Sequence, residues 1–102
     1  MKTILTAAAA LAFAAGPALA DPMAAMTKAG CMACHAKDKK VIGPAFKDIA
    51  AKYKGQDVTA KLMDKVRKGG GGVWGPVPMS ATGPDKIDDA TLKTAIEFVL
   101  KS

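Results

Sequence analysis

The segment Cys31-Met32-Ala33-Cys34-His35 gathers the only two cysteines and the only histidine of the chain into five consecutive positions. Two thiols at this spacing lie about one helical turn apart, so that both sulfurs can reach one edge of a porphyrin and form thioether bonds with its vinyl groups. The imidazole of the next residue can then turn beneath the ring toward the iron. Because Cys-x-x-Cys-His is the pattern of c-type haem attachment, the sequence predicts one covalent haem c with His35 as an axial iron ligand.

Other uses of a Cys-x-x-Cys pair fit the sequence less well. A dithiol oxidoreductase carries the pair in a βαβ unit, and no useful stretch of this chain alternates apolar and polar residues as a strand does. A structural disulfide is a further alternative. Two cysteines and one histidine exclude a four-thiolate zinc site, a histidine-rich metal site and an Fe–S cluster built by this chain alone.

Length and charge indicate one small basic domain. The chain has 102 residues, of which 50% are hydrophobic, and its 15 Lys and Arg against 9 Asp and Glu give a formal net charge of +6. This length argues against a large multi-part enzyme. The basic residues are not interleaved with aromatic residues as on a nucleic-acid surface, so the lysine excess favours a protein partner.

Residues 1–20 have the pattern of a secretory signal peptide. A basic start is followed by an apolar run over residues 4–15, a helix-breaking Gly-Pro pair, and small residues at −3 and −1 of a cleavage site between Ala20 and Asp21. The run is shorter than the roughly 20 apolar residues of a membrane-spanning helix. We therefore expect export to the periplasm and a mature chain of residues 21–102 that forms a single domain.

The mature chain shows helical periodicity and loop signals but no strand, which predicts an all-α fold. Residues 69–84 hold six Gly and three Pro, a composition that favours a loop. Asp and Pro at a helix start, Gly at its end, and apolar residues at i, i+3 and i+4 define the helices. The expected helices run from Asp21-Pro22 to near Gly30, from Phe46 to Gly55, from about Val58 to Gly69, and from the N-cap Asp88 onward.

The second axial position of the iron has three candidate occupants: a methionine, a lysine, or a small ligand at an open site. No second histidine is present. Met79 differs from the methionines on the expected helices, where methionine is usually core filler, because it follows Pro78 in the Gly/Pro loop and proline stiffens the backbone. Since His/Met is the axial pair of electron-carrying c cytochromes, we expect Met79 to be the second ligand.

Three segments and the pattern of the final helix carry a resemblance to a known family. They are Gly30-Cys31-Met32-Ala33-Cys34-His35-Ala36, Val41-Ile42-Gly43-Pro44-Ala45 with Lys47-Asp48, and Gly72-Val73-Trp74-Gly75-Pro76-Val77-Pro78-Met79. Over the whole mature chain the sequence resembles the small class I bacterial cytochromes c, most closely the cytochrome c-551 (cytochrome c8) type. The resemblance implies about four helices wrapped around one covalently bound haem.

The resemblance also implies roles for residues around the haem. The Pro44 carbonyl is expected to accept a hydrogen bond from the second nitrogen of His35, which would orient the ring. The Trp74 indole N–H is expected to donate to a haem propionate, with Lys65 as a basic residue nearby. Thr82 stands where the family often has an asparagine that contacts the methionine sulfur, which leaves the orientation of that sulfur open.

These observations together predict a soluble periplasmic electron carrier rather than an enzyme. The resemblance implies a donor to a nitrite reductase or a terminal oxidase. A monomer is expected to dock transiently on redox proteins through lysines around the exposed haem edge. Two alternatives are a haem enzyme or gas sensor with an open sixth position and a tightly bound subunit of a larger redox complex. The docking lysines would be Lys28, Lys37, Lys39, Lys40 and Lys47.

Overall fold

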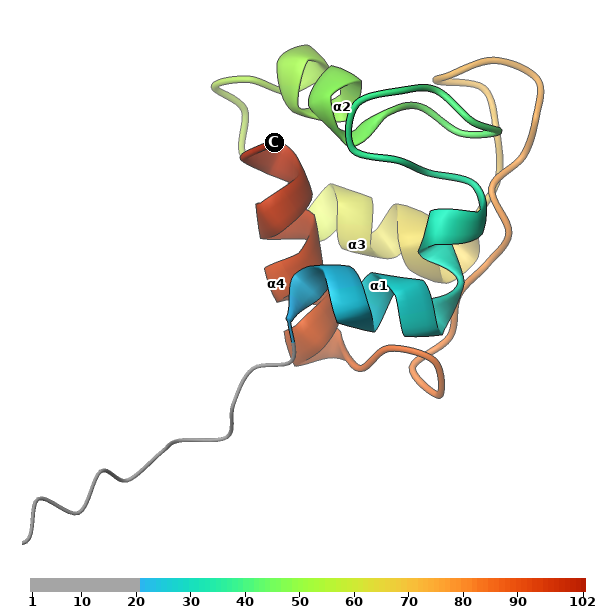
Figure 1. The fold of residues 1–102 in the computed structure, drawn as a ribbon, viewed down its shortest axis with the longest axis vertical. Coiled ribbons are helices and arrows are strands. Elements are labelled where there is room, and N and C mark those ends of the chain that lie inside the picture. Colours follow the sequence, from blue (N-terminus) through green and yellow to red (C-terminus); the bar gives the residue numbers. More distant parts are fainter. Residues whose placement is uncertain (1–20) are drawn as a thin grey trace, which may run out of the picture.

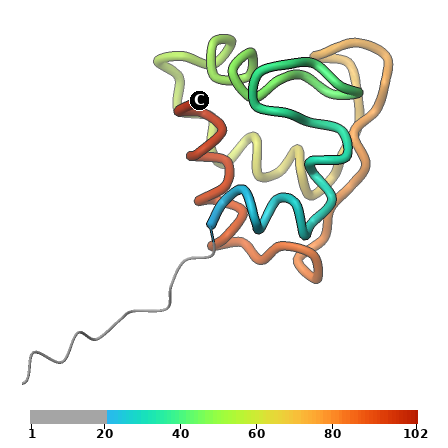
Figure 2. Tube along the Cα trace, in the orientation of Figure 1, coloured from blue at the N-terminus to red at the C-terminus, as the bar shows by residue number. Residues whose placement is uncertain are grey.

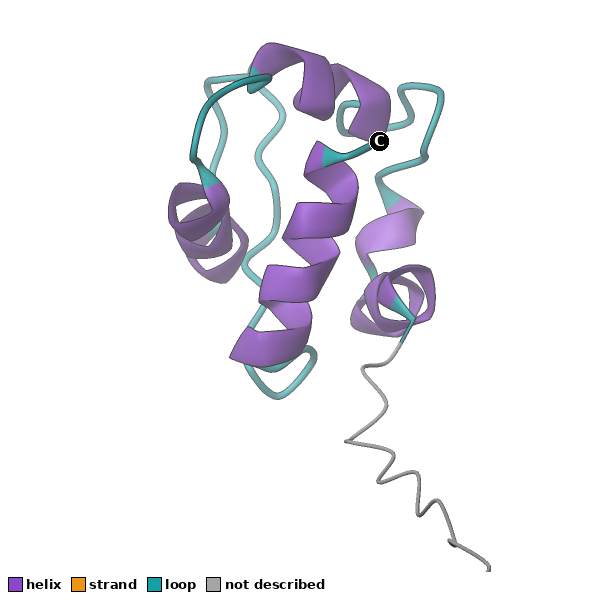
Figure 3. Ribbon diagram, turned by 90° about the vertical axis from the view of Figure 1, so that its left-hand side faces the viewer, coloured by secondary structure: helices purple, strands orange, loops and turns teal. Residues whose placement is uncertain are grey.

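A computed structural model describes residues 21–102, which contain helices and loops but no named strand (Figures 1 and 3). This confirms the predicted all-α fold class, while the predicted signal peptide lies outside the described residues. Between residues 21 and 102, no helix has the length and apolar character needed to cross a membrane. The elements are α1 (Pro22–Ala29), a short 3-10 helix η1 (Cys31–Ala33), α2 (Phe46–Lys52), α3 (Thr59–Lys68) and α4 (Asp89–Leu100).

Aspartate caps begin the first and last helices, as the sequence predicts. The Asp21 carboxylate accepts a hydrogen bond from the Met23 backbone N–H at 3.2 Å. The Asp88 carboxylate accepts one from the Thr91 backbone N–H at 2.8 Å, and this bond lowers the pKa of Asp88. Each cap satisfies one of the free N–H groups at a helix start.

The helix ends follow the glycine signals with one difference. Gly30 closes α1 in the left-handed region at φ 92°, where a residue without Cβ is favoured. Gly69 follows the last residue of α3. The second helix ends at Lys52 instead of continuing to Gly55, because Tyr53 leaves the helical region at φ −103° and ψ 12° while its side chain remains buried.

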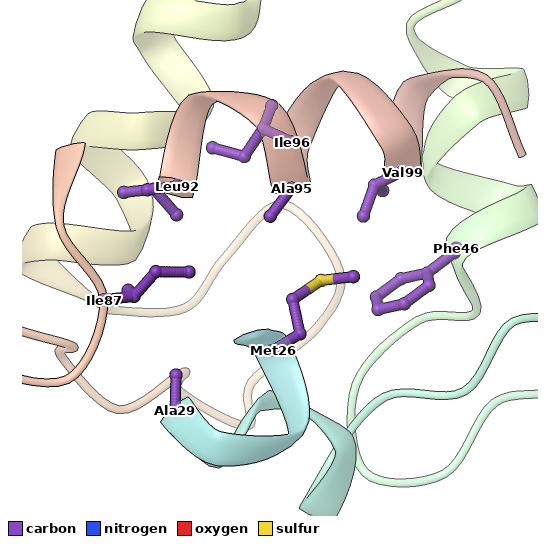
Figure 4. Close-up of a cluster of buried hydrophobic side chains, with 8 residues drawn as sticks. All are labelled: Met26, Ala29, Phe46, Ile87, Leu92, Ala95, Ile96 and Val99. Atoms are coloured by element: carbon purple, nitrogen blue, oxygen red, sulfur yellow. The ribbon is translucent and has the colours of Figure 1, made fainter. Parts of the chain in front are cut away.

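The hydrophobic core lies where α4 packs against α1, α2 and α3. Met26 of α1 points into this core between the side chains of α4 and Phe46 of α2 (Figure 4). Ile87 and Leu92, which flank the Asp88 cap, are both buried and form the predicted hydrophobic staple. The buried cluster consists of Met26, Ala29, Phe46, Ile87, Leu92, Ala95, Ile96 and Val99.

Two long connections carry the residues that the sequence assigns to chemistry. The first joins α1 to α2 and contains η1, and the second joins α3 to α4 and runs along the edge of the molecule (Figure 2). Near its start, the second connection folds back on itself, and Gly70 and Met79 form an isolated antiparallel bridge. The helices therefore act as a frame that holds two irregular segments.

Candidate haem-binding site

The two cysteines lie on the short 3-10 helix η1 and its C-terminal cap, an element that the sequence did not predict. The Cys31 carbonyl accepts hydrogen bonds from the backbone N–H groups of Cys34 at 3.1 Å and of His35 at 3.0 Å. These bonds form η1 and its C-terminal cap, directly after the left-handed Gly30. The turn sets the positions of both thiols and of the histidine relative to each other.

Both cysteines are free thiols and half-buried. Burial raises the pKa of the Cys31 thiol above its ordinary value, a backbone hydrogen bond opposes this, and the proximity of Cys34 raises the pKa further. A reactive dithiol oxidoreductase needs the opposite shift, toward the thiolate. The direction for Cys31 is therefore away from the thiolate that rapid dithiol exchange requires.

The imidazole of His35 is held in one orientation. Its Nδ1 lies 2.8 Å from the Pro44 carbonyl oxygen, and its ring stacks on Phe46 at a centroid distance of 5.6 Å. Because a carbonyl oxygen can only accept, Nδ1 must carry the proton in this hydrogen bond. In the neutral ring this hydrogen bond selects the tautomer in which Nε2 carries the lone pair that a metal ion binds.

Gly43 provides the space that the His35 ring occupies. A Cβ at this position would lie 2.6 Å from Cε1 and 3.0 Å from Nδ1 of the imidazole, which is closer than carbon atoms pack. The Gly43 backbone N–H donates to the Cys34 carbonyl at 2.8 Å, and Ile42 donates to the same oxygen at 3.2 Å. The sequence marked Gly43-Pro44 as a loop, but the contact of this glycine with the ring is visible only in the structure.

Met79 is fixed at the end of α3. Its backbone N–H donates to the Gly70 carbonyl at 3.0 Å, and its carbonyl accepts from the Gly70 N–H at 2.9 Å. At Gly69 a Cβ would lie 2.5 Å from the Met79 carbonyl oxygen and 2.8 Å from the Ala81 nitrogen. The methionine is thus held by backbone contacts on both sides, within a segment that is otherwise irregular.

Trp74 has a basic neighbour that the sequence did not indicate. The ammonium group of Lys52 lies 5.6 Å from the centre of the Trp74 ring system and 5.8 Å from that of Tyr53. Trp74 is 41% exposed and lines a small surface pocket with Pro44, which places the second connection beside the first.

Lys65 lies beside the Gly70 bridge and not beside Trp74. Its Nζ is 3.4 Å from the position that a Cβ on Gly70 would take, next to the backbone that pairs with Met79. The two residues expected at a propionate therefore have separate surroundings: Lys65 adjoins the Gly70 bridge, whereas Trp74 adjoins α2.

The donor set and its packing fit a covalent haem. Two thiols on one turn, an imidazole with a free Nε2 and a thioether on a braced loop are the ligand types of a His/Met c-type centre. The two connections also expose large apolar side chains that a flat hydrophobic ring can contact. These are Val41, Ile42, Val73, Trp74 and Val77.

Comparisons with known proteins show which family this chain is similar to. The family described as cytochrome c matches residues 20–102. The chain is 46% identical over 84 residues to cytochrome c2 of Rubrivivax gelatinosus, across 81% of this chain and 99% of that protein. It is 43% identical over 81 residues to cytochrome c-551 of Pseudomonas aeruginosa, across 78% of this chain and 75% of that protein. The crystal structure of wild-type Nitrosomonas europaea cytochrome c552 superimposes with a TM-score of 0.69 and 39% identity, covering 78% of this chain and 96% of the other.

Replacing Gly43 with alanine should disturb the imidazole. The added Cβ must displace the His35 ring from the Pro44 carbonyl or shift the backbone, and such overpacking costs about 1–3 kcal/mol of unfolding free energy. Denaturant unfolding of the haem-loaded protein measures this cost. Gly71→Ala is the matched control, because a Cβ there meets nothing closer than 3.4 Å. Equal stabilities for the two variants would show that Gly43 does not act through ring packing.

Proposed function

Because the chain belongs to the cytochrome c family, we propose that it carries single electrons between redox proteins of the periplasm. As a member of that family it is an electron carrier with one covalent haem c and is not an enzyme. The haem iron supplies the change between ferrous and ferric states. The polypeptide binds the haem, holds the axial ligands and presents a docking surface.

The observation that carries the proposal is the arrangement around His35. The ring is hydrogen-bonded through Nδ1 to Pro44, it packs on Gly43, and it follows directly on the turn that carries both thiols. The hydrogen bond directs one ring nitrogen toward Pro44 and leaves the other available, which is the orientation that an axial iron ligand requires.

The roles of the individual residues follow from this arrangement and from the resemblance. Cys31 and Cys34 form the thioether links, and His35 and Met79 coordinate the iron. Pro44 holds the His35 tautomer that leaves Nε2 free. Two further residues, Trp74 and Lys65, are proposed to bind a haem propionate.

The proposed docking surface combines exposed lysines with exposed apolar residues. Lys28, Lys37, Lys39, Lys40 and Lys47 are all exposed and lie on α1, the first connection and the start of α2. The exposed Val41 and Ile42 follow two of these lysines directly. Such a surface suits a weak, transient encounter of a monomer with an acidic protein. The proposed acceptors are a nitrite reductase or a terminal oxidase.

Intact mass spectrometry of the protein purified from its native host tests export and attachment together. The expected mass is that of residues 21–102 plus one haem, because cleavage before Asp21 removes the signal peptide and two thioether bonds survive denaturation. A Cys31→Ala, Cys34→Ala double variant is the control and should lose the haem under the same conditions. A native chain without added haem mass, or one that begins far from Asp21, would contradict the proposal.

The Met79→Ala variant tests the second axial ligand. Loss of the thioether should abolish the sulfur-to-iron charge-transfer band of the ferric protein, lower the reduction potential and open the iron to cyanide, because a methionine ligand favours the reduced state. Met63→Ala is the control, since that residue lies on α3 against the core. If Met79→Ala keeps the charge-transfer band and the native reduction potential, another residue is the second ligand. If the native protein itself lacks the charge-transfer band, the sixth position of the iron is open.

The salt dependence of the electron-transfer rate tests the proposed docking surface. The rate constant for electron transfer to an acidic redox protein should fall as ionic strength rises, because salt screens attraction between exposed charges. Lys40→Gln should lower the rate constant at low salt and flatten its salt dependence. Lys93→Gln removes the same charge from α4, which carries none of these lysines, and should change neither quantity. A rate constant independent of salt would exclude electrostatic steering.

A further inference from the structure

The segment after Met79 is attached to α3 at several points. Thr82, three residues beyond the methionine, is only 8% exposed, and its backbone N–H donates to the Val66 carbonyl at 2.8 Å. The Thr82 carbonyl in turn accepts a hydrogen bond from Nη1 of Arg67 at 3.2 Å. Both backbone polar groups of Thr82 are therefore bonded to consecutive residues of one helix.

Arg67 extends this attachment to α4. While Nη1 reaches Thr82, Nη2 donates to the Asp89 carboxylate at 2.7 Å. The Arg67 side chain is 20% exposed and that of Asp89 is 81% exposed. An ion pair with one solvated partner adds little stability by itself. The planar guanidinium group instead acts as a fork: its two terminal nitrogens donate to two acceptors at once in a fixed geometry.

We propose that Arg67 is a positioning residue for the Met79 thioether. By holding the Thr82 carbonyl and the first turn of α4 together, it limits the movement of residues 79–82. The Gly70 bridge and the tight contact at Gly69 restrain the other end of that segment. Without the two bonds of the guanidinium, Met79 would leave the iron more often. The inference rests on the proposed role of Met79 as axial ligand.

Lys68 offers a matched control on the same helix. Its ammonium group pairs with Asp64 at 3.0 Å, and both side chains are largely exposed. Lys68→Gln removes one positive charge from α3, as Arg67→Gln does, but it breaks only a surface pair between positions i and i+4. Arg67→Lys keeps the charge and removes the fork, so that it separates geometry from electrostatics.

The experiment measures cyanide binding to the ferric, haem-loaded protein, which requires Met79 to leave the iron. Arg67→Gln should increase the observed binding rate about tenfold, the effect expected from losing hydrogen bonds to a charged group. Arg67→Lys should increase it less, and Lys68→Gln should stay within about twofold of the native protein. The rate in Arg67→Gln should also be nearly independent of low denaturant concentrations, because a local opening exposes little surface.

Three outcomes would overturn a role of Arg67 in positioning the ligand. The first is a cyanide rate in Arg67→Gln equal to that in Lys68→Gln. The second is a rate that rises with denaturant as steeply as global unfolding does, since the effect would then be general destabilisation. The third outcome applies if Arg67→Gln fails to take up haem. The test then uses Arg67→Lys, and a cyanide binding rate equal to that of the native protein in this variant would overturn the proposal. A native protein that lacks the sulfur-to-iron band would instead overturn the assignment of Met79, which keeps the two failures distinct.

Discussion

The hydrogen bond between Nδ1 of His35 and the Pro44 carbonyl is the constraint on which the rest of the site depends. At 2.8 Å it selects one tautomer, and that tautomer is the one with a free Nε2. The bond can form only because Gly43 leaves room for the ring and because the Cys34 carbonyl draws Ile42 and Gly43 back toward the haem-attachment turn. The segment from His35 to Pro44 thus closes on itself, and the start of α2 holds it through the Phe46 ring and the backbone N–H groups of Phe46 and Lys47.

The two proposed iron ligands are held by different means. The contacts of His35 come from residues close in sequence, from Cys31 to Phe46. Those of Met79 come from Gly69 and Gly70, which follow α3, and Arg67 links the nearby Thr82 to α4. A thioether is a neutral and weak ligand, so its occupancy depends on how firmly the chain presents it. Under the proposed role of Arg67, the packing of α3 on α4 would affect the Met79 ligand as well as the stability of the fold.

The sequence predicted the elements whose signals are local. The Asp88 cap, the Ile87 and Leu92 staple and the Gly30 stop depend on residues a few positions apart, and the structure shows all three. The bond from Arg67 to Thr82 spans 15 positions and that to Asp89 spans 22. No periodicity or motif indicates such pairs, because they exist only once the helices have packed. The contact of Lys52 with Trp74 could not be predicted from the sequence for the same reason. The 3-10 helix η1 was missed because three residues are too few to show a helical pattern.

Electron transfer is faster at a site whose geometry changes little between oxidation states. If both axial ligands stay bound in the ferrous and ferric forms, few atoms move when the charge changes, and the barrier to transfer stays small. Gly43, Pro44 and Phe46 meet this requirement on the histidine side by fixing a ring. On the methionine side no ring can be fixed, so the backbone itself is held, at Met79 by Gly70 and at Thr82 by Val66 and Arg67. With His35 and Met79 as the proposed ligands, a domain with so small a core would keep six-coordination in both states through restraints that act on the ligand segments directly.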